Sequence, residues 1–175
     1  FLDIGFQKTS GLIFKNLKFE FFESINLGNI KANINEAEPV LRDSNIVSFN
    51  IDSVKSGDLN NAHQYPNGLN SYELCSLSRF SGLSSRIKIV SFFENWDLSI
   101  MNSLLAESLW YVLDGYSTRV DENPLDDSND FIYYHVELDN YKFKFYRSKF
   151  SDRWWVEFLN DELITIKKDI ISCTL

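Results

Sequence analysis

Cysteine and histidine are scarce in this sequence, and their scarcity narrows the chemistry that the chain can perform. Cys75 and Cys173 are the only cysteines, and they lie far apart. The chain therefore has no Cys-x-x-Cys pair for a zinc ribbon or a thioredoxin-type redox site, and we interpret both residues as reduced, packed thiols. His63 and His135 are the only imidazoles. A metal site made by this chain alone would consist mostly of carboxylates.

Basic residues and long apolar runs are also few. The chain has 17 Lys and Arg against 25 Asp and Glu, a formal net charge of -8, so it lacks the positive surface that neutralises nucleic-acid phosphates. No apolar run approaches the roughly 18 residues that cross a bilayer. We therefore expect a soluble, cytoplasmic protein with no membrane span and no nucleic-acid partner. Because residue 1 is Phe and not an initiator Met, the absence of a signal peptide carries no weight.

Apolar residues, in contrast, are plentiful enough for a core. Of 175 residues, 44% are hydrophobic and 15% are aromatic, and this length is typical of one domain. We predict a single domain over residues 1–175, with an α/β portion over residues 1–118 and a β-rich portion over residues 119–175.

Strand and helix patterns alternate in the first of these portions. Short apolar runs predict strands at residues 2–7, 45–51 and 87–93. The last of these is apolar almost throughout, as in a parallel sheet with both faces covered. Helical spacing of apolar residues predicts helices at residues 12–25, 36–42, 71–82 and 98–115. This alternation predicts parallel crossovers and an open three-layer α/β/α sandwich, which binds ligands at the carboxyl ends of its strands.

Single residues indicate where these helices begin and end. Glycine commonly terminates a helix, so we expect three of the helices to end at Gly28, Gly82 and Gly115. Pro39 must lie in a first turn, where its missing N–H costs least. Ser71 is the expected N-cap of the third helix.

The last third of the chain has a different pattern. Residues 121–130 are acidic and predict a solvated loop, because their spacing does not match a calcium-binding EF-hand. Residues 131–148 alternate on either side of an Asp-Asn pair, which predicts an antiparallel hairpin extension in which His135 packs across the strands. Trp154 and Trp155 are adjacent in a predicted strand, so they must face opposite sides, and at most one packs inward.

Two polar side chains follow the strand at residues 45–51 and raise a question of chemistry. Asn50 and Asp52 are two positions apart, so along a strand they point the same way. They are either a metal site with one ligand altered or a strand that runs out into solvent. The loop that follows, residues 52–70, is long and rich in Asn, Gly, Ser and Asp, and long ordered loops are often functional.

The segment "VSFNIDSVKSGD" resembles the Ser-Phe-Asp-x-Asp metal motif of the ureohydrolases, the arginase, agmatinase and formimidoylglutamase family. Further segments resemble a formimidoylglutamase-like bacterial branch of it in the same order: "EAEPVLRDSNIVSF", "YPNGLNSYELCSLSRFSG", "SLWYVLDGY" and "SDRWWVEF". The resemblance spans residues 4–173 and corresponds to the C-terminal half of such an enzyme.

The resemblance implies an arginase-like fold and a site for two manganese ions. Asn50 and Asp52 occupy two ligand positions of that site, and one of the two has lost its charge. Lys55 stands where arginase-like members carry a further Asp, although the formimidoylglutamase-like branch also allows a basic residue there. No stretch of residues 1–175 supplies the remaining ligands. We therefore expect the catalytic residues upstream of residue 1.

The resemblance also names candidates for substrate binding. Glu73 matches the family glutamate that binds the cationic nitrogens of the substrate, and the alternative is an ordinary helix carboxylate. His63 lies in the long loop, as a substrate-binding residue or as a surface histidine. Glu94 and Asn95 match residues that hold loops together by hydrogen bonds.

Two functions follow from this reading. The first is a hydrolase-like protein related to the enzymes that cleave linear amidine or guanidine C–N bonds, with weak or no activity as this chain. The second is a pseudoenzyme that serves as a scaffold subunit for protein interactions. In either case we expect the missing N-terminal half, or a partner chain, to cover the exposed side of the sheet in an oligomer or larger complex.

Overall fold

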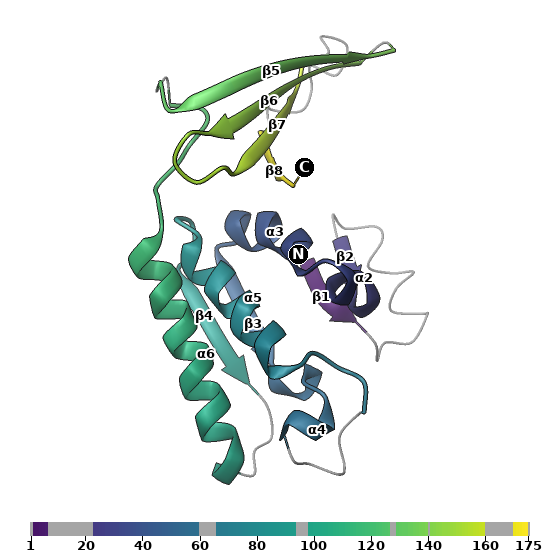
Figure 1. Cartoon of the computed structure of the whole chain (residues 1–175), viewed down its shortest axis with the longest axis vertical. Helices are drawn as coiled ribbons and strands as arrows, with labels where there is room; N and C mark the ends of the chain where they lie inside the picture. Colours follow the sequence, from purple (N-terminus) through teal and green to yellow (C-terminus); the bar gives the residue numbers. More distant parts are fainter. Residues whose placement is uncertain are drawn as a thin grey trace. The chain divides into compact units, whose positions relative to one another are not determined.

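The computed structural model describes residues 2–6, 23–59, 66–93, 98–126, 129–139, 141–159 and 170–174. The chain divides into two compact units, residues 1–119 and residues 120–175 (Figure 1). The first combines helices with parallel strands and the second is an antiparallel sheet, so the architecture is α/β with a β extension. Among the described residues, no helix is both long enough and apolar enough to cross a membrane.

The first unit begins with a small parallel sheet, in which β1 (Leu2–Phe6) pairs with β2 (Glu23–Asn26). The prediction of a helix over residues 12–25 is therefore wrong at its end, because Ile25 lies in β2. Gly28 does not end a helix either, since it lies within α2 (Leu27–Ala32). The break between strand and helix is made by Asn26, whose side-chain oxygen accepts the N–H of Asn29 at 2.9 Å. Residues 12–22 lie outside the described part.

The next elements follow the predicted pattern closely. A 3-10 helix, η1 (Ile34–Ala37), runs into α3 (Glu38–Asp43), and Pro39 lies in the first turn of α3 as expected. The two central strands are confirmed as β3 (Ile46–Asn50) and β4 (Ile89–Phe93).

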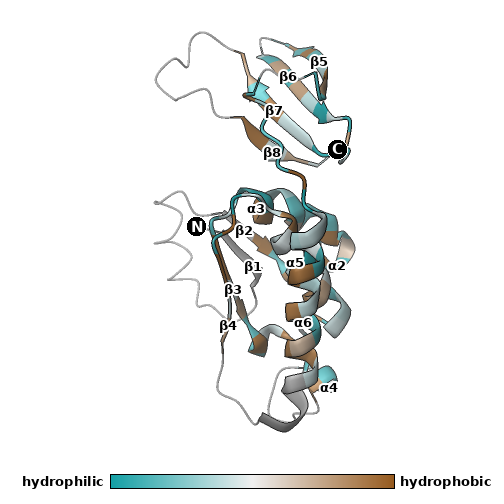
Figure 2. Ribbon diagram, turned by 90° about the vertical axis from the view of Figure 1, so that its left-hand side faces the viewer, coloured by the Kyte–Doolittle hydropathy of each residue, from teal (hydrophilic) through white to brown (hydrophobic). Residues whose placement is uncertain are grey.

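The strands β3 and β4 are parallel and in register, and one face of the pair carries the core of the first unit. Val47 and Phe49 are buried on this face, and the ring of Phe49 stacks on that of Phe92 with centroids 5.0 Å apart. Leu74 and Leu77 of α5 (Ser71–Leu83) belong to the same buried cluster. Figure 2 shows α5 and α6 (Leu98–Thr118) on one side of this sheet.

The opposite face of the β3–β4 pair is exposed. Ile46, Ile89 and Phe93 point to this face and are between 48% and 62% exposed. Between them the Ser48 and Ser91 hydroxyls hydrogen-bond to each other at 2.7 Å. We expected both faces of this sheet to be covered. Among the residues that the structure describes, one face is covered and the other is exposed.

Glycines set the distance between α5 and α6. Gly82 faces the backbone of α6, where an added Cβ would overlap the carbonyl oxygen of Val112, and Gly115 faces the carbonyl oxygen of Arg79 in the same way. Both glycines lie inside their helices, which continue to Leu83 and Thr118. The prediction that they end the helices is wrong, because the requirement at these positions is close helix packing and not a change of backbone direction.

The second unit is a four-stranded antiparallel sheet in the order β5-β6-β7-β8. Its strands are β5 (Phe131–Leu138), β6 (Tyr141–Ser148), β7 (Trp154–Phe158) and β8 (Ile171–Cys173). The predicted hairpin is β5–β6, and β7 and β8 extend it into a sheet.

One face of this sheet holds a small core. Phe131, Tyr146 and Trp155 are buried together, and the Tyr146 hydroxyl donates to Glu157 at 2.5 Å. Burial, followed by this contact with Glu157, raises the pKa of Tyr146, so the phenol stays protonated and remains the donor. Trp154 lies on the opposite face, as predicted from its place next to Trp155. His135 is exposed on β5 opposite Lys144.

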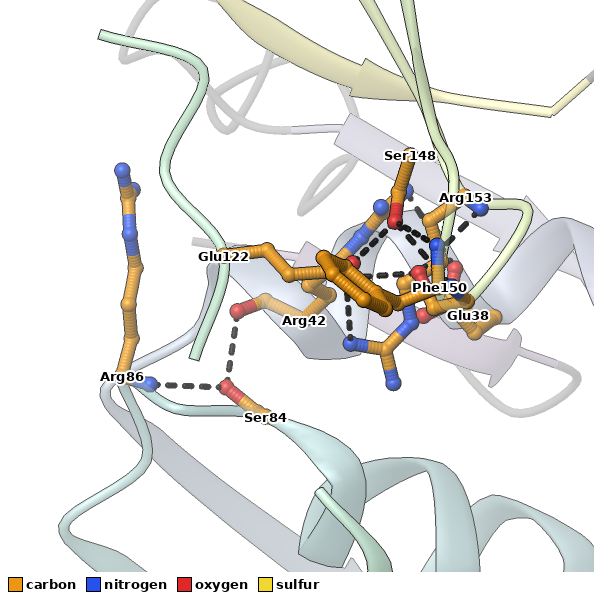
Figure 3. Close-up of polar contacts among 9 residues, drawn as sticks. Glu38, Arg42, Ser84, Arg86, Glu122, Ser148, Phe150 and Arg153 are labelled. Carbon is orange, nitrogen blue, oxygen red and sulfur yellow. Dashed lines mark hydrogen bonds and ion pairs between the residues drawn. The ribbon is translucent and has the colours of Figure 1, made fainter. Parts of the chain in front are cut away.

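A buried carboxylate fixes the turn between β6 and β7. Glu122 accepts hydrogen bonds from the hydroxyls of Ser148 and Ser151, and Arg153 lies 3.8 Å from it (Figure 3). The side chains of Glu122 and Arg153 are only 4% and 12% exposed. This network ties the segment before β5 to the turn that follows β6.

The close approach of α5 and α6 gives a first prediction. We expect Gly82→Ala to lower the free energy of unfolding by about 1–3 kcal/mol, because the new methyl group overlaps the backbone of α6 and the helices must separate. Urea unfolding followed by circular dichroism measures this. The control is Gly57→Ala in α4 (Ser56–Leu59), where an added Cβ meets nothing within 4 Å and the change should be neutral or slightly stabilising. Equal effects of the two substitutions would contradict the packing role.

Candidate functional site

The candidate site lies at the carboxyl end of β3, where the strand turns into a short 3-10 helix, η2 (Ile51–Ser53). Asn50 is the last residue of the strand and the N-cap of this helix. Its side-chain oxygen accepts the N–H of Asp52 at 2.8 Å. The Asn50 side chain is therefore held by the backbone of Asp52, in a bond that does not involve the Asp52 carboxylate.

The same end of the first unit collects several element termini. The carboxyl ends of β3 and β4, the short helix α4 and the N-termini of α5 and α6 all lie there (Figure 1). In parallel α/β sheets this is the end at which ligands bind. Asn50 lies at such a strand end, as predicted. Asp52 lies beyond the strand in η2, so the strand alternation that predicted a common direction for the two side chains does not extend to it.

The loop after η2 is closed by backbone hydrogen bonds. The N–H of Lys55 donates to the carbonyl of Leu69 and the N–H of Leu69 donates to that of Ser53, both at 2.8 Å. Gly68 packs against this junction, where an added Cβ would come within 2.5 Å of the Ser53 carbonyl oxygen. The glycine of the Pro-Asn-Gly sequence is thus required by the close approach of two backbone segments.

Asp58 of α4 joins this loop to α5. Its carboxylate accepts both the N–H and the hydroxyl of Ser71, at 2.7 and 3.0 Å, and lies 3.1 Å from the ammonium of Lys55. Burial disfavours the charged form of Asp58, but the Ser71 N–H, Lys55 and the Ser71 hydroxyl outweigh it, so the pKa of Asp58 is lowered. Lys55, which stands near the expected ligands, is thereby paired within its own loop.

Glu73 takes part in capping α5. Its carboxylate accepts the backbone N–H of Asn70 at 2.7 Å, while the Asn70 side chain accepts the N–H of Glu73 at 2.8 Å, which together form a capping box. The prediction that Ser71 caps this helix is wrong. Asn70 is the N-cap, and the signal that could have identified it is the spacing of three residues between Asn70 and Glu73.

A second charge lies near Glu73. The ammonium of Lys31 in α2 is 3.5 Å from its carboxylate, and the Glu73 side chain is 13% exposed. A carboxylate in this position stabilises the positive end of the helix dipole and already has a cation as a neighbour. Binding of a guanidinium by Glu73 stays a prediction, and it would require the substrate to compete with Lys31.

Three further candidates fall outside the described residues. His63 lies in the segment 60–65, and Glu94 and Asn95 lie in the segment 94–97. Their predicted roles stay predictions.

The acidic segment of the second unit offers an alternative place for a ligand. A pocket of about 150 Å³ is lined by Asp121, Glu122, Asp126 and Asp130, among others. Glu122, however, is occupied by Arg153 and two serine hydroxyls. Nothing observed at this pocket therefore indicates which ligand it would bind.

No protein-family model matches the sequence, and no curated protein is similar to it in sequence. Solved structures do match. Formiminoglutamase from Trypanosoma cruzi, in a crystal structure with Mn2+2, aligns with a TM-score of 0.59 and 17% identity over 68% of this chain and 44% of its own.

Two other solved structures give the same result. Formimidoylglutamase from Bacillus subtilis aligns with a TM-score of 0.58 and 15% identity over 69% of this chain and 42% of its own. Arginase from Entamoeba histolytica, solved in complex with L-ornithine, aligns with a TM-score of 0.56 and 12% identity over 64% of this chain and 42% of its own. This chain has an arginase-like fold. It spans less than half the length of the solved structures that it matches.

The residues present do not fit the two-manganese site that an arginase-like fold suggests. Among the described residues, no group of three or more His, Cys, Asp and Glu side chains lies close enough to hold a metal ion. At the end of β3 there is one carboxylate, Asp52, and one amide, Asn50, whose oxygen accepts the N–H of Asp52. Two dications need several carboxylates to offset their mutual repulsion, and this set of donors has too little charge.

Asp58 gives a prediction for the dependence of stability on pH. Because its pKa is lowered on folding, the stabilisation it provides is present above the unfolded pKa of about 3.8 and is lost as the pH falls through the lower folded value. We expect Asp58→Asn to lower the free energy of unfolding by about 1 kcal/mol at pH 7 and by less below pH 3. Urea unfolding of both proteins across this pH range measures the difference. A difference that stays constant with pH would contradict the role of the charge.

Proposed function

We propose that this protein belongs to the ureohydrolase family, in a formimidoylglutamase-like branch, and that its metal site is degenerate. The support is the arginase-like fold together with the placement of Asn50 and Asp52 at the carboxyl end of β3. The single observation that carries the proposal is the amide at position 50, with its oxygen hydrogen-bonded to the backbone of Asp52.

The loss of one charge at this point has a large electrostatic effect. A unit negative charge about 4 Å from a unit positive charge contributes roughly 4 kcal/mol at an effective dielectric constant near 20. A neutral amide supplies none of this, and it cannot bridge two ions as a carboxylate does. The function that follows is weak or absent hydrolysis of linear amidine or guanidine C–N bonds by this chain. Formimidoylglutamate is a better candidate substrate than arginine, because the sequence resembles the formimidoylglutamase-like branch.

Restoring the carboxylate tests the proposal. In the full-length protein, we expect Asn50→Asp to raise manganese affinity by at least about tenfold, because it returns one ligand charge. The fold should be unaffected, since aspartate caps a helix as well as asparagine does. Elemental analysis after dialysis against manganese measures the metal content, and release of formamide, ammonia or urea measures turnover.

A matched control is Asn45→Asp, which adds the same charge just before β3, at the end of the strand away from Asn50. It should leave the manganese content unchanged. If the unmodified protein already holds two manganese ions per chain, or turns over formimidoylglutamate at the rate of Asn50→Asp, the degenerate-site proposal is wrong.

A second function is favoured by the same site. If position 50 has lost its catalytic use altogether, the protein is a pseudoenzyme whose retained fold serves as a scaffold for protein interactions. The use of Asn50 as a helix cap, of Glu73 in a capping box and of Lys55 in an ion pair with Asp58 all support a structural role for this loop. This second function predicts that Asn50→Asp leaves the protein without activity even when it gains metal.

We further propose that the exposed face of β3–β4 is covered by the other half of an arginase-like fold, carried by a preceding segment or by a partner chain. The face presents Ile46, Ile89 and Phe93 to solvent. The solved structures that match are more than twice as long as the part aligned with this chain. A helix layer on this face would complete the three-layer sandwich.

The uncovered face leads to a prediction about solution behaviour. We expect the isolated 175-residue chain to aggregate as its concentration rises, because an apolar sheet face is left in water. Replacement of Ile89 and Phe93 by serine should reduce this aggregation without loss of the circular dichroism spectrum. Dynamic light scattering over a range of concentrations measures it. A wild-type chain that gives no aggregates at any concentration would count against the proposal.

A further inference from the structure

The second unit has an apolar sheet face that the proposed function does not use. By the register of the strands, this face carries the even-numbered residues of β5 and β7 and the odd-numbered residues of β6 and β8. We call it the aromatic face, because it holds six aromatic rings: Tyr134, Tyr141, Phe143, Phe145, Trp154 and Phe158. The opposite face holds the buried cluster of Phe131, Tyr146 and Trp155.

Within the part of the chain that the structure describes, the aromatic face is half-buried at its centre and exposed toward its edges. Its rings contact one another across the strands, with centroids 5.3 Å apart for Tyr134 and Trp154 and 4.9 Å apart for Phe143 and Phe158. Leu138, Tyr141, Phe158 and Ile171 are between 50% and 63% exposed. Aromatic rings held in place by their neighbours lose little conformational entropy when a partner covers them.

The area of the aromatic face is that of a protein–protein interface. Ile132, Tyr134 and Val136 are about 40% exposed, and with the four residues above they leave on the order of several hundred Å² of mostly apolar surface in water, since a large aromatic side chain has roughly 150–250 Å² to bury. Monomeric proteins rarely expose a contiguous apolar patch of more than a few hundred Å², and a standard interface buries about 800 Å² on each partner. The face is therefore large enough to support a stable dimer.

The charge of the aromatic face indicates which partner it fits. Arg147 is the only charged residue at these positions, and it pairs with Asp152 at 2.8 Å. A partner therefore needs no complementary charge. A second copy of the chain meets this condition, because two copies related by a twofold axis present the same neutral, apolar surface to each other. Two such sheets pack face to face about 10 Å apart, as in a β-sandwich.

We infer that this protein forms a homodimer by packing the aromatic faces of two copies against each other. The inference does not depend on the proposed hydrolase-like function, since the aromatic face belongs to residues 120–175 and the candidate metal site to residues 1–119. Dimerisation here would pair two arginase-like units regardless of whether either one binds metal.

Two adjacent residues of β5 provide a matched test. Val136 lies on the aromatic face and His135 on the opposite one, and both are exposed. We expect Val136→Lys to weaken dimerisation about 100-fold or more, because it places an unpaired ammonium in an apolar interface, and His135→Lys to leave it unchanged. Sedimentation velocity of the full chain measures the dimer, in the Ile89→Ser/Phe93→Ser background so that the β3–β4 face does not contribute.

A second variant covers the case in which Val136→Lys does not fold. Circular dichroism shows whether Val136→Lys is folded. If Val136→Lys is unfolded, Tyr141→Lys, at the hairpin end of the aromatic face, is measured in its place. The inference is overturned if the folded variant, Val136→Lys or Tyr141→Lys, still dimerises as the unmodified chain does. It is also overturned if His135→Lys weakens the dimer as much as that variant does. A chain that stays monomeric up to about 100 µM also overturns the inference. If residues 1–119 cover the aromatic face in that monomer, Val136→Lys will lower its stability. If the face binds lipid instead, the monomer will co-sediment with phosphatidylcholine vesicles.

Discussion

The parallel, in-register pairing of β3 with β4 is the constraint on which the first unit depends. It places Phe49 against Phe92 on the buried face and Ser48 against Ser91 on the exposed face. Since side chains alternate along a strand, a slip of one residue would turn Val47 and Phe49 into solvent and bring the serines into the core. The same register makes Asn50 the last paired residue, and so fixes the point at which the chain leaves the sheet.

At that point the chain uses its polar residues for structure. Asn50 caps η2, Asp58 holds the N-terminus of α5, and Glu73 and Asn70 cap each other. Each of these bonds satisfies a backbone N–H that the end of a helix would otherwise leave unpaired. The carboxyl end of β3 can therefore keep its shape without a metal ion, because local hydrogen bonds provide the order that charged ligands and a cation would provide in a metalloenzyme. An arginase-like fold can therefore carry an amide at this position.

Local patterns in the sequence predicted β3, β4, the β5–β6 hairpin, the proline of α3 and the opposite orientations of Trp154 and Trp155, because strand alternation and the missing N–H of proline act within a few residues. They also placed Asn50 at the end of β3. They missed β2, where a helix was predicted. They failed at Gly82 and Gly115, whose role is set by the backbone of a helix some 30 residues away in sequence. The contacts of Asp58 with Ser71 and of Glu73 with Lys31 could not be predicted either, because these partners are far apart in sequence and are brought together only by the fold.

The two exposed apolar faces of the chain differ in a way that bears on what covers them. The β3–β4 face has a polar pair in its centre, but Ser48 and Ser91 satisfy each other, so a covering layer can exclude water without leaving a hydroxyl unpaired. Its apolar residues stand at the two ends of the strands, which suits helices that cross the sheet and contact it at several points. The aromatic face is instead continuous across four strands and has its one cation neutralised at Asp152. A broad, neutral sheet surface of that kind is suited to packing against another sheet, and a second copy of the chain presents one.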